Sequence, residues 1–586
     1  MYLLIFYLSV LVKKTNSPIQ ERNQQSIWIT HQSFQNQTNI KTVFITGSSG
    51  VMGKSTLNQF VKHLDEFKLK LLLRPSQNNQ KIIQDYQNKY GSEKIEVIWG
   101  NLVNYNDVLK GVEGSDYILH IGGLVSPQAD TYPYLTQKTN IESAQNIVKA
   151  VLQQKDPDSI KVCYIGSVAE TGNRNYPVHW GRTGDPIKIS IYDHYGRSKA
   201  IAERIIVESG IKNWVVLRQT GILHPGLFKL MDPIIFNIPT NNVLEWCTVE
   251  DSGRVMLNLV MKDKDNELPK DFWNRFYNIG SGEKYRMSNY EFETMIFKHI
   301  GLGRMEDSFE PNWFSTKNFH GHYFLDSDIL EDYLQFRENV PKEEYFNRMI
   351  DQIAFYYKIA NYVPFKKLIS FAVKIFMRSI ASKKWAGTID WIKNNKTDRI
   401  TAFYGSFDEF QKIPKNWFDF NFLNINSSTK YGLKNKLNHG YNEDKPRNEL
   451  ELSDLIEAAK FRGGEVVSKT MKKGDLVTKI VWRCGHCKKT FLASPTLILF
   501  GGHWCPHCFI PMDSWNYDSI ARTNPFFAQV WYNDHEINEN NVYGFAQIFN
   551  ESCYYDDPLH PHHGLIRNNN KKFSLFNHIS FWLNVS

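Results

Sequence analysis

An apolar hexapeptide followed at once by three spaced glycines is the feature that most constrains this chain. Residues 41–46 read KTVFIT, residues 47–53 read GSSGVMG, and the next stretch, STLNQFVKHL, carries apolar residues at helical spacing. A strand, a glycine turn and a helix in this order make a βα unit. Its turn brings backbone N–H groups and a helix N-terminus close to phosphate. The segment therefore predicts a nucleotide site.

Two kinds of phosphate loop share parts of this pattern. The triphosphate loop GxxxxGKS needs glycine at position 48, where this chain has Ser48. The dinucleotide loop needs one glycine for the tight turn, one for close approach of the pyrophosphate and one for helix against strand, and Gly47, Gly50 and Gly53 supply them. We therefore predict a dinucleotide loop.

Strand-like and helical segments alternate after this loop. The apolar runs KLLLR, IEVIW and DYILHIGG are separated by helical patterns, which predicts an α/β fold with a doubly wound parallel Rossmann sheet and a smaller substrate lobe. The boundaries we predict are an apolar or disordered extension (1–39), a dinucleotide-binding domain (40–340), a helical extension (341–400), a linker (418–447), a small zinc-binding module (450–550) and a tail (551–586).

Composition limits the class of protein. A net charge of +8 over 586 residues gives no independent support for nucleic-acid binding. The first twelve residues are apolar but shorter than the ~20 that a membrane span needs, and two lysines follow them instead of preceding them. We expect a structural or spurious extension there, more than a signal or anchor. The odd count of seven cysteines favours a reducing, cytoplasmic location.

The residue that follows the second predicted strand bears on cofactor choice. Arg74 stands where NAD-binding loops place a carboxylate for the ribose hydroxyls, and no carboxylate occurs between Arg74 and Asp85. A guanidinium matches a ribose phosphate by bidentate hydrogen bonding. We predict NADP ahead of NAD, with a solvated surface arginine as the alternative.

A tyrosine and a lysine at helical spacing follow the fifth predicted strand. Tyr195 and Lys199 are four residues apart, so they share one helix face. A nearby ammonium favours the phenolate and brings tyrosine into the range of acid-base catalysis. The alternative is a surface pair on an amphipathic helix.

Together these segments resemble the extended short-chain dehydrogenase/reductases of the NAD-dependent epimerase/dehydratase family, over about residues 41–337. GSSGVMG, GNLVNYNDV, GSVAETG and YDHYGRSKA carry the resemblance, although Asn101 replaces the usual aspartate near the adenine. The resemblance implies catalysis by Ser167, Tyr195 and Lys199. It implies cofactor contacts from Gly47, Ser49, Gly50, Met52, Gly53, Arg74, Asn101, Leu102, Tyr195 and Lys199.

The loop between Ser167 and Tyr195 is particular to this chain. It holds four candidates for substrate contact, His179, Trp180, Arg182 and Asp185, with packing inside the loop as the alternative. Many nucleotide-sugar enzymes of the family carry an asparagine three residues after the arginine of the sixth strand, but here Gly221 follows Arg218. A nucleotide sugar is therefore an open alternative.

Four cysteines near the C-terminal end form two close pairs. Cys484, Cys487, Cys505 and Cys508 have the CxxC spacing of a tetrahedral zinc site, which resembles a zinc ribbon or treble clef. Four thiolates leave no coordination position for water, so we expect structural zinc. A protein or nucleic-acid partner of this module, and its docking on the enzyme, both stay open.

Residues 365–384 form a basic amphipathic pattern. We favour a helix packed on its own protein over one that lies on an anionic membrane.

Three functions compete. The first is an NAD(P)-dependent oxidoreductase that acts on an alcohol or carbonyl of a small molecule. The second is an epimerase or dehydratase of a nucleotide sugar that regenerates its cofactor in each turnover. The third is a cofactor-sensing adaptor without catalysis, against which Ser167, Tyr195 and Lys199 count. A homodimer is compatible with each.

Overall fold

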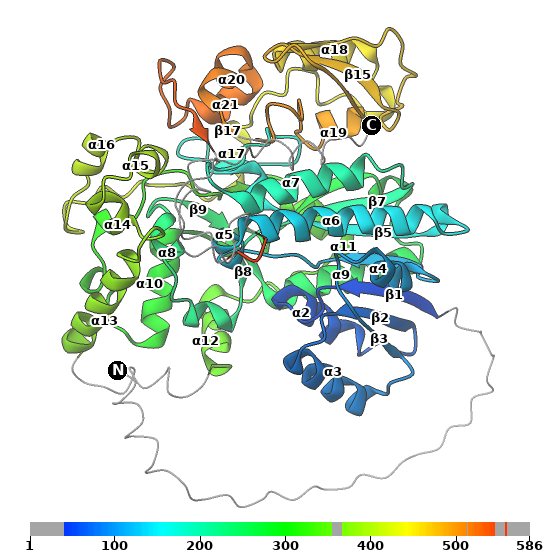
Figure 1. The fold of residues 1–586 in the computed structure, drawn as a ribbon, viewed down its shortest axis with the longest axis horizontal. Helices are drawn as coiled ribbons and strands as arrows, with labels where there is room; N and C mark the ends of the chain where they lie inside the picture. The colour runs from blue at the N-terminus through cyan, green and yellow to red at the C-terminus, as the bar shows by residue number, and fades with distance from the viewer. Residues whose placement is uncertain (1–39, 354–365, 512–513, 545–556, 560–586) are drawn as a thin grey trace, which may run out of the picture.

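The computed structural model describes residues 40–353, 366–511, 514–544 and 557–559 (Figure 1). The predicted N-terminal extension and most of the predicted tail lie outside the described residues. Among the helices that are described, none combines the length and apolar character needed to cross a bilayer.

The centre of the protein is a parallel sheet of seven strands. In sheet order they are β3 (Ile95–Trp99), β2 (Phe67–Leu73), β1 (Lys41–Thr46), β4 (Tyr117–His120), β5 (Lys161–Ser167), β7 (Asn213–Gln219) and β11 (Arg275–Ile279). The order reverses between β1 and β4, and in open α/β sheets ligands bind at such a switch point. The predicted doubly wound Rossmann sheet is confirmed.

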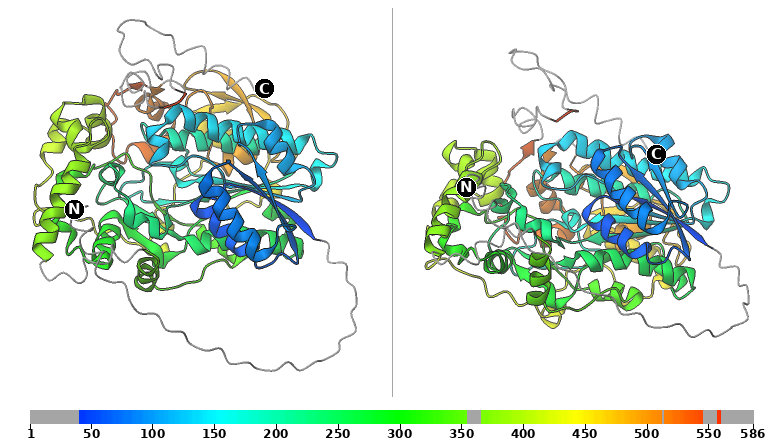
Figure 2. Two further views of the ribbon diagram at one scale, coloured as in Figure 1. Left: turned by 60° about the horizontal axis from the view of Figure 1, so that its bottom comes forward. Right: turned by 90° about the horizontal axis from the view of Figure 1, so that it is seen from below.

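Alternate residues of each strand face two separate cores. Phe44 packs on one side of β1, whereas Val43 and Ile45 pack on the other. The first side is covered by α4 (Tyr105–Val112), α6 (Pro133–Leu152) and α7 (His194–Val207). The second is covered by α2 (Val51–Phe60), α3 (Gln77–Tyr90), α9 (Val249–Lys264) and α11 (Ser327–Leu334). Figure 2 shows the sheet between these two helical layers.

A smaller lobe with its own core lies beyond the carboxyl ends of the strands. It contains β8 (Ile222–Leu223), β10 (Cys247–Thr248), β9 (Val243–Glu245), β12 (Arg286–Ser288), α8 (Ile234–Asn237), α10 (Asn289–Ile300) and α12 (Lys342–Asp351). Helix α10 begins with a capping box, in which Ser288 and Glu291 satisfy each other's backbone N–H groups. Its buried side chains then close the lobe.

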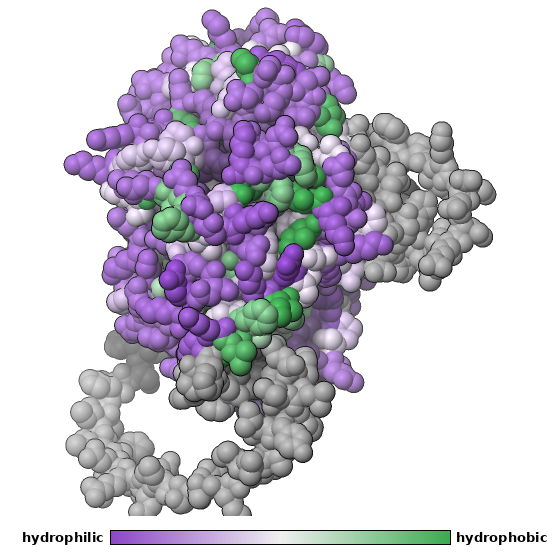
Figure 3. Space-filling model, turned by 90° about the vertical axis from the view of Figure 1, so that its left-hand side faces the viewer, coloured by the Kyte–Doolittle hydropathy of each residue, from purple (hydrophilic) through white to green (hydrophobic). Residues whose placement is uncertain are grey.

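The predicted helical extension continues from this lobe. The residues predicted to form it, 341–400, hold α12, α13 (Lys366–Ala381), α14 (Thr388–Lys393) and the start of α15 (Thr397–Tyr404), and α16 (Phe407–Gln411) follows. Helix α13 packs through Ser370, Met377 and Ala381, but Leu368, Phe371 and Ile375 on its outer side are 67%, 61% and 59% exposed. Figure 3 faces this side, where hydrophobic patches interrupt a largely hydrophilic surface. One face of α13 therefore packs on its own protein, as expected, and the other face is exposed.

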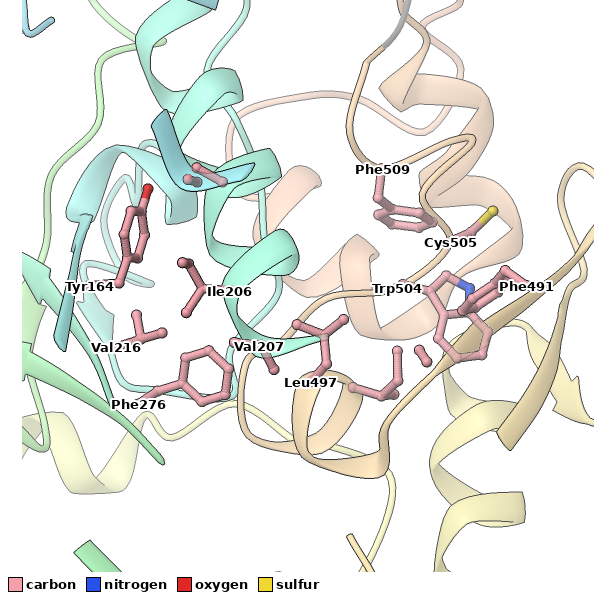
Figure 4. Packing of buried hydrophobic residues seen from close by; sticks show 14 of the residues in the cluster. Tyr164, Ile206, Val207, Val216, Phe276, Phe491, Leu497, Trp504, Cys505 and Phe509 are labelled. Atoms are coloured by element: carbon pink, nitrogen blue, oxygen red, sulfur yellow. The ribbon is translucent and has the colours of Figure 1, made fainter. Parts of the chain in front are cut away.

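The C-terminal part lies against the layer of α6 and α7 (Figures 1 and 2). It contains α18 (Leu452–Phe461), β14 (Gly464–Val466), β15 (Ile480–Cys484), β16 (Thr490–Ala493), α19 (Pro495–Leu499), β17 (Ser514–Trp515), α20 (Tyr517–Thr523), α21 (Pro525–Trp531) and β18 (Tyr543–Gly544). The segment predicted as a linker supplies α17 (Thr429–Lys434). Leu497, Trp504 and Phe509 belong to the same hydrophobic core as Ile206 and Val216 (Figure 4).

Candidate active site

The loop between β1 and α2 forms a cradle that side chains would fill. Gly47 has a φ of +73°, and a Cβ placed on it would lie 2.7 Å from Cα of Gly122, just beyond β4. A Cβ on Gly53 would lie 2.1 Å from the carbonyl oxygen of Gly47. The exposed Gly50 caps α2 without a side-chain hydrogen bond, so N–H groups of the first turn stay open to a ligand. These residues fit the pyrophosphate of a dinucleotide.

The remaining predicted cofactor residues lie around this cradle. Ser49 is half-buried in the turn, and Met52 is buried in the core between α2 and the sheet. Arg74 directly follows β2 and is exposed. Asn101 and Leu102 follow β3 at the same edge, where the Asn101 N–H donates to Asp107 over 2.9 Å. The edge beside β1 is where an adenosine lies in this type of sheet.

The structure brings Ser167, Tyr195 and Lys199 together. Ser167 ends β5, and Tyr195 and Lys199 are one turn apart at the start of α7, which Asp193 caps by accepting from the Gly196 N–H over 2.7 Å. The Ser167 and Tyr195 hydroxyls are hydrogen-bonded to each other.

Burial sets the charge of both titratable groups. Burial raises the pKa of Tyr195 above its usual value, and the hydrogen bond from Ser167 opposes this rise. Burial lowers the pKa of Lys199 to about 8, against the carboxylates of Glu170 and Glu203, which raise it. The Lys199 ammonium donates to the Ile165 carbonyl oxygen. At neutral pH the site thus holds a phenol and a lysine ammonium in a desolvated setting suited to proton exchange.

Asn140 on α6 joins the loop after β4 to α7. Its side chain accepts from the Leu124 N–H over 2.8 Å and donates to the Ser198 hydroxyl over 2.9 Å. The Ser198 hydroxyl donates to the Tyr195 carbonyl oxygen over 2.7 Å. The backbone of Tyr195 is therefore linked, through Ser198 and Asn140, to the loop after β4, which lies beside the glycine cradle.

Comparison with known proteins identifies what this chain is similar to. Residues 44–234 match the model of the 3-beta hydroxysteroid dehydrogenase/isomerase family. A UDP-glucose 4-epimerase of Rickettsia bellii (strain RML369-C) is 27% identical over 174 residues, which are 30% of this chain and 45% of that protein. One of Rickettsia massiliae (strain Mtu5) is 25% identical over 170 residues, 28% of this chain and 43% of that protein. The chain thus spans less than half the length of these curated relatives.

The stretch matched by the family model, residues 44–234, is about a third of the chain and lies within the parallel sheet, as a resemblance to the extended short-chain dehydrogenase/reductases implies. The predicted resemblance, to a family of enzymes, is confirmed. Among solved structures, a dTDP-glucose 4,6-dehydratase from Bacillus anthracis str. Ames in complex with NAD has a TM-score of 0.40 at 16% identity, over 53% of this chain and 96% of that one. A UDP-glucuronic acid 4-epimerase from Bacillus cereus in complex with NAD has a TM-score of 0.40 at 17% identity, over 55% and 99%.

The four predicted substrate contacts pack against neighbouring segments. Trp180, in β6 (Trp180–Gly181), is buried beside Tyr323 of β13 (Tyr323–Phe324), and the His179 ring stacks on Tyr431. Asp185 and Arg182 hold the segment that leads to the C-terminal module. Asp185 accepts from His439 over 2.9 Å, and Arg182 pairs with Glu443 over 2.8 Å. These contacts match the packing alternative; a role toward substrate stays a prediction.

Sequence reasoning missed a set of charged residues directly behind the predicted catalytic residues. Glu170, Glu203, Arg218 and His503 are all buried. In the sequence, Arg218 stands out only as the arginine of the sixth predicted strand, and His503 lies two residues before Cys505. Two buried carboxylates beside a buried arginine leave no periodic signal, so only the tertiary structure reveals them.

The four predicted metal ligands converge. Each offers a sulfur, and the four sulfurs lie within 4.8 Å of one another. Sγ of Cys487 is 3.6 Å from that of Cys505, and Sγ of Cys484 is 4.0 Å from that of Cys508. A tetrahedron with Zn–S bonds of about 2.3 Å has sulfurs roughly 3.8 Å apart. The cluster therefore fits a closed zinc site, and zinc itself stays a proposal.

Proposed function

We propose that this protein is a dinucleotide-dependent epimerase or dehydratase in which Tyr195 exchanges a proton with a substrate hydroxyl. The observation that carries the proposal is the hydrogen-bonded pair of Ser167 and Tyr195, with Lys199 one turn away, at the sheet edge that bears the glycine cradle. Sequence alone put net oxidoreduction first. The similarity of this domain to proteins named UDP-glucose 4-epimerase favours the second function instead.

Each catalytic residue has a separate task. The bound dinucleotide would accept a hydride from the carbon that bears the substrate hydroxyl and return it. Tyr195, as the phenolate, would take the hydroxyl proton at its oxygen and give it back when the hydride returns, and Ser167 would hold the same substrate oxygen through a hydrogen bond. Lys199, with its pKa near 8, would favour the phenolate and bind the nicotinamide ribose.

A nucleotide sugar is the first substrate class to test, because the curated relatives carry such names. Two arginines near the lobe already have carboxylate partners: Arg218 donates to Glu203 and Arg286 donates to Glu245 over 2.8 Å. Neither is available to a diphosphate, and Gly221 stands in place of the usual asparagine. Net oxidation of another secondary alcohol is therefore the second candidate, which the match to a dehydrogenase/isomerase family favours.

The cofactor proposed is NADP ahead of NAD. Arg74 is exposed at the end of β2, at the position from which a side chain reaches the adenosine ribose. A 2′-phosphate would gain a charge-assisted hydrogen bond there.

The test is to incubate the purified full chain with NAD or NADP and a panel of nucleotide sugars and secondary alcohols. The proposed reaction changes the substrate while the absorbance of reduced nicotinamide stays low. Accumulation of reduced nicotinamide in proportion to product would support net oxidation instead. Tight dinucleotide binding without any product would overturn both and favour the adaptor.

A further inference from the structure

The C-terminal module places one buried histidine behind the catalytic residues. His503 follows α19, and its Nε2 is hydrogen-bonded to Oε1 of Glu203 over 2.8 Å. Glu203 lies on α7 one turn beyond Lys199, on the same helix face. The module therefore reaches the helix that carries Tyr195 and Lys199 through a side chain inside the protein.

Glu203 is also bound by the arginine of β7. Arg218 donates from Nε to Oε2 over 3.0 Å and from Nη2 to Oε1 over 2.6 Å. The same Nη2 donates to the carbonyl oxygen of Gly501, two residues before His503, over 2.6 Å. Both the side chain of Glu203 and that of Arg218 thus have a partner in the module. A bidentate pair of this kind has a defined geometry that one lost partner can shift.

The network ends at a catalytic residue. Arg218 Nε lies 3.8 Å from Oε2 of Glu170, and Oε1 of Glu170 accepts from the Ser167 N–H over 2.7 Å. Glu170 and Glu203 are also the two carboxylates that raise the pKa of Lys199. A displacement of Glu203 would therefore change both the support of Ser167 and the charges that Lys199 senses.

A metal ion is the other occupant that this cluster suggests. Ligand atoms of Glu170, Glu203 and His503 lie within 4.8 Å of one another. However, the buried guanidinium of Arg218 already pairs with both carboxylates. A metal ion would have to enter beside that positive charge in a buried place, where like charges repel strongly. The geometry favours a hydrogen-bonded network over a metal site.

We propose that His503 is a positioning residue for the catalytic site, so that the cysteine module is a working part of the enzyme. His503 holds Glu203 in place. The contacts from Glu203 through Arg218 to Glu170 then fix the backbone of Ser167 and the positions of the two carboxylates near Lys199. The proposal rests on the proposed function, because it assigns His503 a role at that site. A buried network with one partner removed relaxes, and a shift of about 1 Å at reacting groups can cost roughly 10²-fold in rate.

The experiment compares His503→Leu, His503→Gln and His503→Asn in the full chain. Leucine removes the hydrogen bond, glutamine places an N–H near the position of Nε2, and asparagine is too short to reach Glu203. We expect the leucine and asparagine variants to lower kcat by about 10-fold to 10²-fold with little change in KM for the dinucleotide. Glutamine should restore most of kcat. The pH at which kcat is half-maximal should also move in the two impaired variants, since the charges around Lys199 change.

A second readout does not depend on turnover. Amide hydrogen exchange should become faster at residues 166–171 in the leucine and asparagine variants but not in the glutamine variant, while residues 41–60 stay protected. If the wild type turns over no substrate, the proposed function fails, and this exchange pattern alone decides the role of His503. If leucine does not fold, the comparison of asparagine with glutamine carries the test.

Glu208→Gln is the matched control. Glu208 caps the other end of α7, five residues beyond Glu203, and accepts from the Ser494 hydroxyl over 2.6 Å, so it also joins α7 to the module. The control should leave kcat and the exchange at 166–171 unchanged. The proposal is overturned if Glu208→Gln impairs both as much as His503→Leu, or if all three His503 variants behave like the wild type.

Discussion

Gly47 and Gly122 face each other beyond the carboxyl ends of β1 and β4, so closely that a Cβ on Gly47 would lie 2.7 Å from Cα of Gly122. Gly47 also has a φ of +73°. Gly47→Ala should therefore suffer both backbone strain and a clash with the neighbouring strand. We expect it to lower the free energy of unfolding by roughly 1–3 kcal/mol or more and to abolish dinucleotide binding, measured by calorimetry.

Gly114→Ala separates the two causes. Gly114 has a φ of +67°, but a Cβ there would meet nothing within 4 Å. This control should show the strain alone and keep dinucleotide affinity. Equal loss of affinity in both variants would contradict the assignment of the cradle.

Cofactor preference should depend on Arg74. Arg74→Asp removes the partner for a ribose phosphate and adds an acceptor for ribose hydroxyls, so the preference for NADP over NAD should reverse. Lys81→Asp makes the same charge change at an exposed position on α3 and should leave the preference intact. Equal affinity of the wild type for both dinucleotides would show that Arg74 does not read the phosphate.

Elemental analysis should find about one zinc per chain, because four thiolates close one coordination shell. Cys505→Ser should release it, whereas Cys247→Ser, in the substrate lobe, should not. Cys505 and Trp504 belong to the core that also contains Ile206 of α7. Loss of zinc should therefore speed hydrogen exchange in residues 194–207 as well as beyond residue 450. Full zinc retention by Cys505→Ser would refute the site.

Stability should fall as the pH is lowered from 7 to 5. Burial lowers the pKa of His120 to about 3, from 6.5 in the unfolded chain, so between these values only the unfolded state takes up the proton. The contribution of neutral His120 to the free energy of unfolding is fully present above pH 6.5. Below pH 6.5 it declines by up to about 1.4 kcal/mol per pH unit. His120→Gln should make Tm less dependent on pH in this range. An unchanged dependence in His120→Gln would contradict this assignment.

Local patterns predicted the sheet and its cofactor loop because their signals lie within a few residues. The strand KTVFIT, the three glycines and the Tyr195–Lys199 spacing are each readable in one window of sequence. The contact of His503 with Glu203 joins residues 300 positions apart. A histidine between CGHC and CPHC is common near a zinc site. Nothing in the local sequence therefore indicated that His503 contacts a residue of α7.

The loop from residue 173 to 193 shows the same limit. Arg182 and Asp185 are polar residues in a loop near the site, which is typical of substrate contacts. Their partners, Glu443 and His439, come from a segment whose composition predicted a linker. Only the fold brings the two segments together.

The central claim is that Tyr195 exchanges the substrate proton, and Tyr195→Phe tests it most directly. The variant loses the hydroxyl but little volume, so dinucleotide affinity and Tm should match the wild type, while turnover should fall by roughly 10²–10⁴. Ser167→Ala should lower turnover more than dinucleotide affinity, and Lys199→Met should lower both. Turnover by Tyr195→Phe at the wild-type rate, on a substrate that the wild type converts, would contradict the account.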